Sequence, residues 1–298
     1  MYKIIDLEQN TPEWLAWREG KATASQSPSV MGESKYFPHT PYEMYLIATG
    51  QAEKPFYNKA MQRGHEFEDE ALQHANRFFD ADYKPLLAES ELYKNFAASL
   101  DGFDPAKKLA ILEIKTTKEG GAIWNNGLEI YHWQLTHQCA VMGVSEAMLY
   151  AYDPDTKTAK PMLFKVKDSD IKKLVKAWND YFNCINNFEI PALTDRDYID
   201  GEKIEGLTDM LEELREIKRQ QAELKNAYDL KFRDIVELCG DRPTKINGCT
   251  ISRTTRKGNV NYKNIPELYD VDLDKYRGKP TTFWTLREPR KTKTNSNN

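Results

Sequence analysis

Two short apolar runs in the middle of the chain carry ionisable residues. Residues 96–100 (FAASL) are followed directly by Asp101, and residues 109–115 (LAILEIK) contain Glu113 and Lys115. Both runs have the length and apolar content of buried β-strands. An ionised group in such a strand is costly unless it is paired or binds a metal. The fold must therefore bring these charges to a place where something compensates them.

Strand geometry predicts where these side chains point. Side chains alternate between the two faces of a strand, so Glu113 and Lys115 share a face. The segment DPAKK (104–108) predicts a hairpin between the two strands. We expect Asp101 at the end of the first strand, where a tight Asp-Gly turn would let it reach the same spot.

One Asp, one Glu and one Lys meeting at a sheet edge predict a hard-cation site. Oxygen ligands of this kind suit Mg²⁺ or Mn²⁺, and not zinc. Lys115 could orient or deprotonate a water beside the metal, and nearby positive charge would favour its neutral form. The alternative is that Glu113 and Lys115 only pair with each other on a half-exposed strand face, because strand alternation produces such pairs by chance.

The order of the elements predicts a mixed sheet flanked by helices, an α/β or α+β core. Thr11 and Pro12 are typical of a helix start, and Gly20 of its end. The expected helices otherwise lie at 41–51, 59–79, 131–144 (read as amphipathic) and 168–188. The expected strands lie at 84–93, 96–102, 109–117, 146–153 and 159–167.

The sequence changes character near residue 200, where we place a domain boundary between 1–200 and 201–298. A long amphipathic helix is predicted from Leu207 to Leu238, because apolar residues follow a heptad-like spacing. They fall at 207, 210, 214, 217, 224, 228, 235 and 238, with Gln221 and Lys231 interrupting. A hairpin is predicted around Asn247-Gly248, and the final KTKTNSNN is predicted to be disordered.

Charge and composition exclude several classes of protein. The net charge is -4, yet from Arg242 to the end thirteen lysines and arginines face five acidic residues. A basic tail on an acidic body suggests a polyanionic partner, although solubility alone also explains a charged tail. The start of the chain does not read as a signal peptide, and no apolar stretch could span a membrane. The four cysteines form no CxxC pair, so reduced thiols in a cytoplasmic protein are expected.

Several ordered motifs between residues 11 and 145 carry a family resemblance. They are W-L-x-x-R and T-A-S (Trp14, Arg18, Thr23, Ala24, Ser25), R-G-x-x-x-E-x-x-A (Arg63, Gly64, Glu68, Ala71), S-L-D-G (Ser99, Asp101), L-E-I-K-T (Glu113, Lys115) and Y-x-x-Q (Tyr131, Gln134). Together they resemble the PD-(D/E)XK nuclease core and, within it, the lambda-exonuclease/YqaJ family of phage-type recombination nucleases. The region after residue 200 lies outside the resemblance.

The resemblance implies a restriction-endonuclease-like core over residues 1–200, with two metal ions at its active site. Asp101 and Glu113 would hold the metals together with the Ile114 carbonyl. Glu68 would support the second metal, although its acidic run EFEDE also fits a solvated helix face. Lys115 would position the attacking water.

Five further residues match the lining of the family's active site. Tyr131 and Gln134 would line it from one helix face, and Arg18, Ser25 and Ser99 would grip a 5′-terminal phosphate. Arginine forks onto phosphate oxygens, and hydroxyls complete their hydrogen bonds. Alternatively, Arg18 only pairs with a neighbouring glutamate on an exposed helix. Trp14 and Trp17 are expected in the core.

The function implied is a Mg²⁺-dependent exonuclease that degrades one strand of duplex DNA from its 5′ end and leaves 3′ overhangs for recombination. The resemblance also implies a ring-shaped homotrimer and a single-strand annealing protein as partner. One alternative is an endonuclease with the same core. Another is a non-catalytic DNA-binding or scaffold protein that uses the long helix and the basic tail. The aromatic and basic segment 262–284 suits either single-stranded DNA or a small packed domain.

Overall fold

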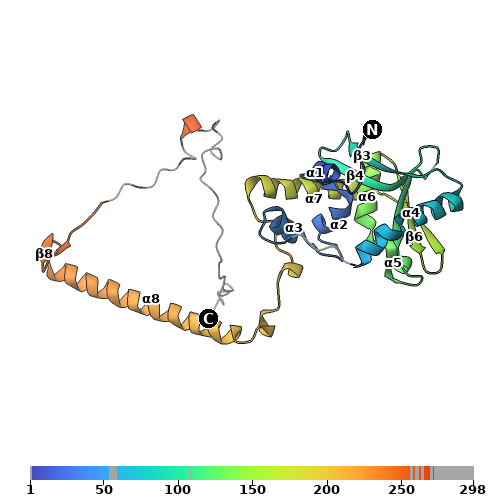
Figure 1. The fold of residues 1–298 in the computed structure, drawn as a ribbon. Coiled ribbons are helices and arrows are strands. Elements are labelled where there is room, and N and C mark those ends of the chain that lie inside the picture. The colour runs from blue at the N-terminus through green and yellow to red at the C-terminus, as the bar shows by residue number, and fades with distance from the viewer. Residues whose placement is uncertain are drawn as a thin grey trace, which may run out of the picture. The chain divides into compact units, whose positions relative to one another are not determined.

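The computed structural model describes residues 2–53, 59–107, 109–255, 258, 262, 265–268 and 271 (Figure 1). The chain divides into two units, residues 1–199 and 200–298. Each unit is described by itself. Within the described residues, no helix is both long and apolar enough to cross a bilayer.

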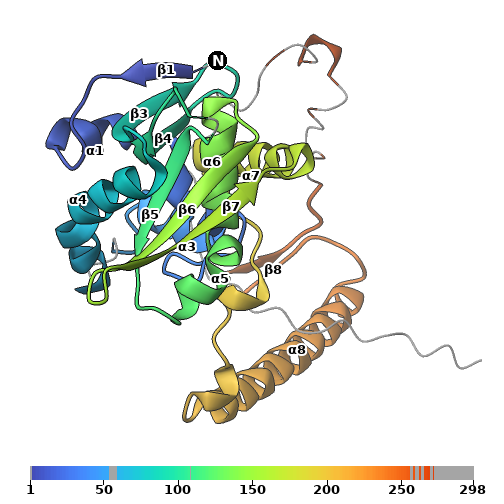
Figure 2. The ribbon, with the colours of Figure 1, turned by 90° about the vertical axis from the view of Figure 1, so that its right-hand side faces the viewer.

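The first unit is built on one mixed sheet of seven strands (Figure 2). The strand order is β1-β3-β4-β5-β6-β7, and β2 pairs with β4. Pairing is antiparallel except between β5 and β6 and between β2 and β4. The strands are β1 (Tyr2–Ile5), β2 (Ala22–Thr23), β3 (Lys84–Ser90), β4 (Phe96–Phe103), β5 (Ile111–Thr116), β6 (Glu146–Asp153) and β7 (Thr158–Lys165).

Helices enclose the sheet and form two apolar cores. One core joins β4, β5 and β6 to residues of α2, α3, α6 and α7, and the other packs α4 against β5 and β6. The helices are α1 (Pro12–Arg18), η1 (Ala24–Gln26), α2 (Ser27–Val30), α3 (Pro41–Ala48), α4 (Lys59–Phe79), α5 (Ala122–Ile130), α6 (His132–Met142), α7 (Asp168–Asn187) and η2 (Asp195–Asp197). The predicted fold class, a mixed sheet flanked by helices, is confirmed.

Local signals explain several helix boundaries. Thr11 caps α1, since its hydroxyl accepts a hydrogen bond from the Trp14 amide, and Pro12 occupies the first turn. Thr40 and Pro41 begin α3 in the same way. Gly143 follows α6 with φ of 69°, a conformation that glycine adopts without strain. The strand β1 and the helix α5 were not predicted.

Two expectations, one about β4 and one about α6, are wrong. Asp101 and Gly102 do not form a turn, because both lie inside β4. Glycine is needed at 102 for close packing: a Cβ there would lie 3.0 Å from that of Tyr83 and 3.1 Å from that of Leu112. The helix α6 is also not amphipathic, because every residue from Trp133 to Met142 is buried.

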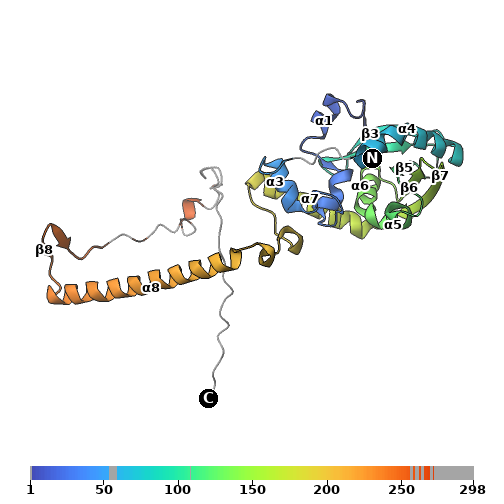
Figure 3. The ribbon, with the colours of Figure 1, turned by 60° about the horizontal axis from the view of Figure 1, so that its bottom comes forward.

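The second unit contains the long helix and one hairpin (Figure 3). After η3 (Gly201–Lys203), α8 runs from Leu207 to Leu238, as the apolar spacing predicts. Strands β8 (Thr244–Ile246) and β9 (Cys249–Ile251) flank Asn247 and Gly248, which have φ of 48° and 78°. The short helix η5 (Pro266–Leu268) completes the described elements. Most of 262–284 and all of the tail 291–298 lie outside the described residues.

A buried histidine ties α6 to the sheet. His137 lies 2.8 Å from the Ser27 hydroxyl through Nδ1 and 3.1 Å from the Ala97 carbonyl through Nε2. Its ring stacks on Phe96 at 4.5 Å. Burial lowers the pKa of His137 to about 3, against the opposing effect of the Ala97 carbonyl. The imidazole is therefore neutral in the folded protein.

This histidine should make the fold sensitive to acid. Below pH 6.5 the unfolded chain binds a proton at His137 that the folded chain excludes, so stability is complete above that pH and falls with it. We expect a loss of about 2 kcal/mol between pH 6.5 and pH 5, measured by urea unfolding. The variant His137→Gln should have a flatter dependence than the parent. Equal slopes in parent and His137→Gln would contradict the assignment.

Candidate active site

The centre of the site is the carboxylate of Glu113, which is only 1% exposed. Glu113 lies in the middle of β5 and faces α6. Gln134 donates a 2.5 Å hydrogen bond to Oε1, and Gln138 donates to Oε2. The Lys115 ammonium lies 2.5 Å from Oε1. Two amides and one cation therefore compensate this buried charge.

Asp101 reaches the same place from β4. The two strands pair only at Gly102–Leu112 and Phe103–Ile111, a register that continues to place Asp101 opposite Glu113. Beyond that point the Ile114 amide donates a 2.8 Å hydrogen bond to the Asp101 carboxylate. Burial raises the pKa of Asp101 well above its ordinary value, Glu113 raises it further, and Lys115 only partly offsets them. The two carboxylates thus repel each other in a partly desolvated place.

Lys115 is a charged donor in this setting. Burial alone would lower its pKa, but Glu113 and Asp101 raise it above the ordinary value. Without a metal, Lys115 is therefore a charged ammonium, which is suited to orienting a water; the neutral form expected beside a bound metal stays a prediction. The ammonium also lies 5.0 Å from the centre of the Tyr131 ring. Burial raises the pKa of Tyr131 to about 12, and its hydroxyl shares a hydrogen bond with Tyr36.

Glu68 approaches from α4 and is within electrostatic range of Asp101, whose pKa it helps to raise. Glu68 is half-buried, and His65 lies 3.3 Å from it. It also lines a hollow of about 930 Å³ between α4, β3 and residues 4–10. On the other side of this hollow, Gln9 donates a 3.3 Å hydrogen bond to the carbonyl of Leu100, next to Asp101.

The donor set fits a divalent cation at Asp101 and Glu113. Two carboxylates, with a third nearby and one ammonium, leave negative charge uncompensated, and hard oxygen ligands suit Mg²⁺ or Mn²⁺. The amide oxygen of Gln138 is buried without a partner among the described residues, so an acceptor for a bound water is available. Within the same residues no three His, Cys, Asp or Glu side chains form a metal-binding group. Ile114 as a ligand and a second ion at Glu68 remain predictions.

A second cluster joins the three residues predicted to bind phosphate. Arg18 donates a 3.0 Å hydrogen bond to the Ser25 hydroxyl, and its guanidinium lies 4.3 Å from the centre of the Trp14 ring. Trp14 in turn donates a 3.1 Å hydrogen bond to the hydroxyl of Ser99. One helix, one turn and one strand of the sheet thus meet here.

Arg18 has the properties of an anion-binding residue. Burial lowers its pKa, and no carboxylate lies within ion-pair distance of it in the part of the chain that the structure describes. The alternative of a pair with a neighbouring glutamate is therefore not observed. Arg63, the other arginine of the motifs, instead forms a 2.7 Å ion pair with Asp155. Among the described residues, Arg18 is thus a cation without a carboxylate partner.

Two residues of the site were missed from the sequence. Gln138 lies one helical turn after Gln134 and binds the other oxygen of Glu113; the signal was a Q-x-x-x-Q spacing inside an apolar run. Trp14 was assigned to the core, where it is indeed 8% exposed, but it also joins Arg18 to Ser99. Its closeness to Arg18 on one short helix was the available signal.

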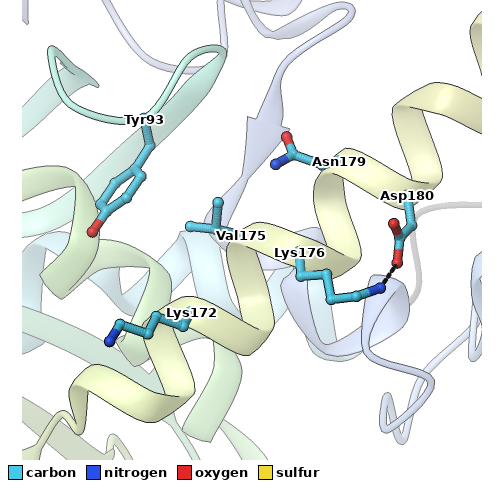
Figure 4. Close-up of a pocket in the computed structure, with 6 residues that line it drawn as sticks. All are labelled: Tyr93, Lys172, Val175, Lys176, Asn179 and Asp180. Atoms are coloured by element: carbon cyan, nitrogen blue, oxygen red, sulfur yellow. Dashed lines mark hydrogen bonds and ion pairs between the residues drawn. The ribbon is translucent and has the colours of Figure 1, made fainter.

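Another hollow, of about 390 Å³, lies on α7 and contains none of the predicted residues (Figure 4). It is lined by Tyr93 together with side chains of α7, and Lys176 there pairs with Asp180 at 2.5 Å. This hollow brings together no carboxylate cluster and no unpaired buried cation. We therefore assign the candidate site to the region around Asp101 on β4 and Glu113 on β5.

Comparison with known protein families concerns the first unit of the chain. Residues 13–145 match the YqaJ-like viral recombinase domain. Over these residues the chain is similar to that family, and the resemblance drawn from its motifs is confirmed there. No curated protein matches.

Solved structures show distant similarity. An alkaline exonuclease from Laribacter hongkongensis has 23% sequence identity and a TM-score of 0.49, covering 72% of this chain and 100% of that chain. The same values hold for that exonuclease in complex with dAMP. A phage related exonuclease from Haemophilus somnus has 16% identity and a TM-score of 0.43, covering 56% of this chain and 96% of that chain.

Repulsion between the carboxylates makes a prediction about stability. Asp101→Asn removes one of the like charges while the amide oxygen can still accept from Ile114. Without divalent cations, we expect this variant to be more stable than the parent by about 1 kcal/mol in urea unfolding at pH 7. The matched variant Asp155→Asn removes a carboxylate that is paired with Arg63 and should give no such gain. A destabilised Asp101→Asn would contradict the repulsion.

Proposed function

We propose that the protein is a Mg²⁺-dependent exonuclease that degrades one strand of duplex DNA from a phosphorylated 5′ end and leaves a 3′ overhang. One observation carries the proposal: the carboxylate centre and the anion pocket share the strand β4. Ser99 belongs to the pocket and Asp101 to the centre, two residues or roughly 7 Å apart. A phosphate held at Ser99 and Arg18 would leave the next phosphodiester beside Asp101.

The residues of the site would divide the work. Arg18, Ser25 and Ser99 would bind the terminal phosphate, as a guanidinium and two hydroxyls can. The hollow of about 930 Å³ beside Glu68 would provide space for the terminal nucleotide. Lys115 would orient the attacking water, because it is charged and within reach of both carboxylates.

The metal ions would be held at Asp101 and Glu113, with Glu68 supporting the second. When bound, they would supply charge stabilisation at the scissile phosphate. Gln134 and Gln138 would fix the Glu113 carboxylate so that it does not need to reorganise. Tyr131 would line the site beside Lys115.

The proposal also includes a homotrimer and an annealing protein as partner. A recombinase domain suits an enzyme that prepares 3′ single strands, which an annealing protein would then receive. A ring-shaped trimer around DNA would keep the enzyme on its substrate. Both follow from the family resemblance.

Two rivals make different predictions. An endonuclease with the same core would not need a site for a terminal phosphate. Arg18 is joined to Ser99 through Trp14 and has no carboxylate partner among the described residues, and this supports the exonuclease. A non-catalytic DNA-binding protein would gain nothing from carboxylates that repel phosphate and each other. The acidic centre therefore supports an enzyme.

Activity on a labelled linear duplex tests the reaction itself. With Mg²⁺, we expect mononucleotides to leave the 5′-phosphorylated end while covalently closed circles stay intact. Lys115→Ala should lose at least roughly 100-fold in rate, because it removes the group that orients the water. Lys157→Ala, which removes a lysine paired with Glu70, is the control. Nicking of the circle would favour the endonuclease.

The phosphate pocket can be tested separately with substrates that differ only at the 5′ end. Arg18→Gln should lower kcat/KM on the 5′-phosphorylated duplex by roughly 10- to 100-fold, the effect of losing hydrogen bonds to a charged group. It should change activity on the 5′-hydroxyl duplex much less. Arg63→Gln serves as the matched arginine control, since Arg63 pairs with Asp155. Equal losses on both substrates would contradict the pocket.

Metal binding has a readout that does not need activity. Adding Mg²⁺ should raise the Tm of the parent protein, because a ligand that binds only the folded state stabilises it. The gain should be smaller for Asp101→Asn, which lacks one proposed ligand charge, and unchanged for Asp155→Asn. The same gain in all three proteins would contradict a metal at Asp101.

A further inference from the structure

The helix α8 carries an apolar stripe that the described residues of the second unit leave exposed. Its 32 residues span more than four heptads, and large apolar residues recur at alternating steps of three and four. Met210 is 68% exposed and Leu224 is 71% exposed. With Leu207 as position a of the heptad, the stripe occupies positions a and d, and these are Leu207, Met210, Leu214, Ile217, Leu224, Tyr228, Ile235 and Leu238.

The opposite face of α8 is already satisfied by its own charges. Glu212 pairs with Arg215 at 3.6 Å, and Glu216 pairs with Arg219 at 2.5 Å. All four residues lie at the outer positions b, c and f. These charged side chains of the outer face are thus paired within the helix, whereas the apolar side chains of the stripe have no packing partner among the described residues. A helix that forms a coiled coil has this arrangement.

The charges beside the stripe select a partner and an orientation. Glu213 lies at position g, and Lys218 lies at the e position of the next heptad. In a parallel, in-register pair, g faces the following e of the partner, so Glu213 meets Lys218 of the other copy. A fully overlapping antiparallel pair would instead place Glu213 near Asp234 and Lys218 near Lys225. Charge complementarity therefore favours a parallel second copy of the same helix.

The polar interruptions agree with this register. Gln221 at position a would meet Gln221 of the other helix, where two amides can hydrogen-bond and fix the register. Lys231 at position d, one turn after Ala227 and near the end of the stripe, has a stem long enough to carry its ammonium out of the seam.

We propose that α8 is a self-association helix that forms a parallel, in-register coiled coil with α8 of a second copy of this chain. The inference rests on the spacing, the exposure and the charges of α8, and it does not depend on the nuclease activity. Docking of the stripe on the chain's own first unit, or on a different protein, would be the competing outcomes.

Disulfide trapping in the full-length protein tests the pairing directly. In a background in which the thiols of Cys239 and Cys249 are replaced by serine, Met210→Cys places one thiol at a d position near the start of α8. Mild oxidation at micromolar concentration should convert most of this variant to a covalent dimer on non-reducing gels. Arg219→Cys, on the outer face, is the matched control and should stay monomeric. A dimer yield no greater than that of the control would overturn the proposal. Docking of the stripe elsewhere, or antiparallel pairing, would give such a low yield.

Variants of the stripe and its flanks sharpen the test. Leu214→Asp with Leu224→Asp, added to Met210→Cys, should abolish the trapped dimer. Leu230→Asp, an equally drastic change at an exposed outer position, should not. Glu213→Lys alone and Lys218→Glu alone should each lower the yield several-fold, and the double exchange should restore it. A double exchange that yields no more dimer than either single one would overturn the parallel register.

Discussion

The buried carboxylate of Glu113 is the constraint on which the first unit depends. A charge that is 1% exposed in the middle of a sheet needs donors close by, and none can come from solvent. Two of them come from one helix, Gln134 and Gln138, one turn apart on α6. Because both amides must point into the sheet, α6 has to cross it as a fully buried helix. The burial of these two amides in the core thus follows from this one charge.

The strand β4 connects the two parts of the candidate site. It contributes Ser99 on the side of Arg18 and Asp101 on the side of Glu113, so both parts of the site rest on one strand of the sheet. Such a strand holds its side chains at fixed spacing, whereas a loop would let them drift. Gly102 allows Tyr83 and Leu112 to close around the strand directly after Asp101. The two facing carboxylates are thus held by paired strands of the central sheet.

Much of the fold followed from the sequence, and its failures have a common cause. Alternation and turn residues placed five of the strands, and heptad spacing gave both ends of α8. The amphipathic interpretation of α6 failed because periodicity assigns polar residues such as Gln134 and His137 to solvent, whereas here they are buried against partners far along the chain. The Asp-Gly pair misled for a related reason, since Gly102 serves packing and not a turn. In the site, Gln138 escaped notice because a single sequence does not state which buried charge an amide will meet.

The two units differ in how their side chains are satisfied. In the first unit, polar side chains that the sequence periodicity assigns to the surface are buried. They form hydrogen bonds and ion pairs there with amides, hydroxyls and one ammonium. In α8 the ion pairs Glu212–Arg215 and Glu216–Arg219 lie on the outer face, and the large apolar side chains of the stripe have no cover among the described residues of the second unit. Helices draw most of their stability from packing of an apolar face, so a 32-residue helix with its stripe exposed is stable in proportion to what covers it. The first unit therefore satisfies its buried polar groups within one chain, whereas the stripe of α8 is left for the partner helix of the proposed coiled coil.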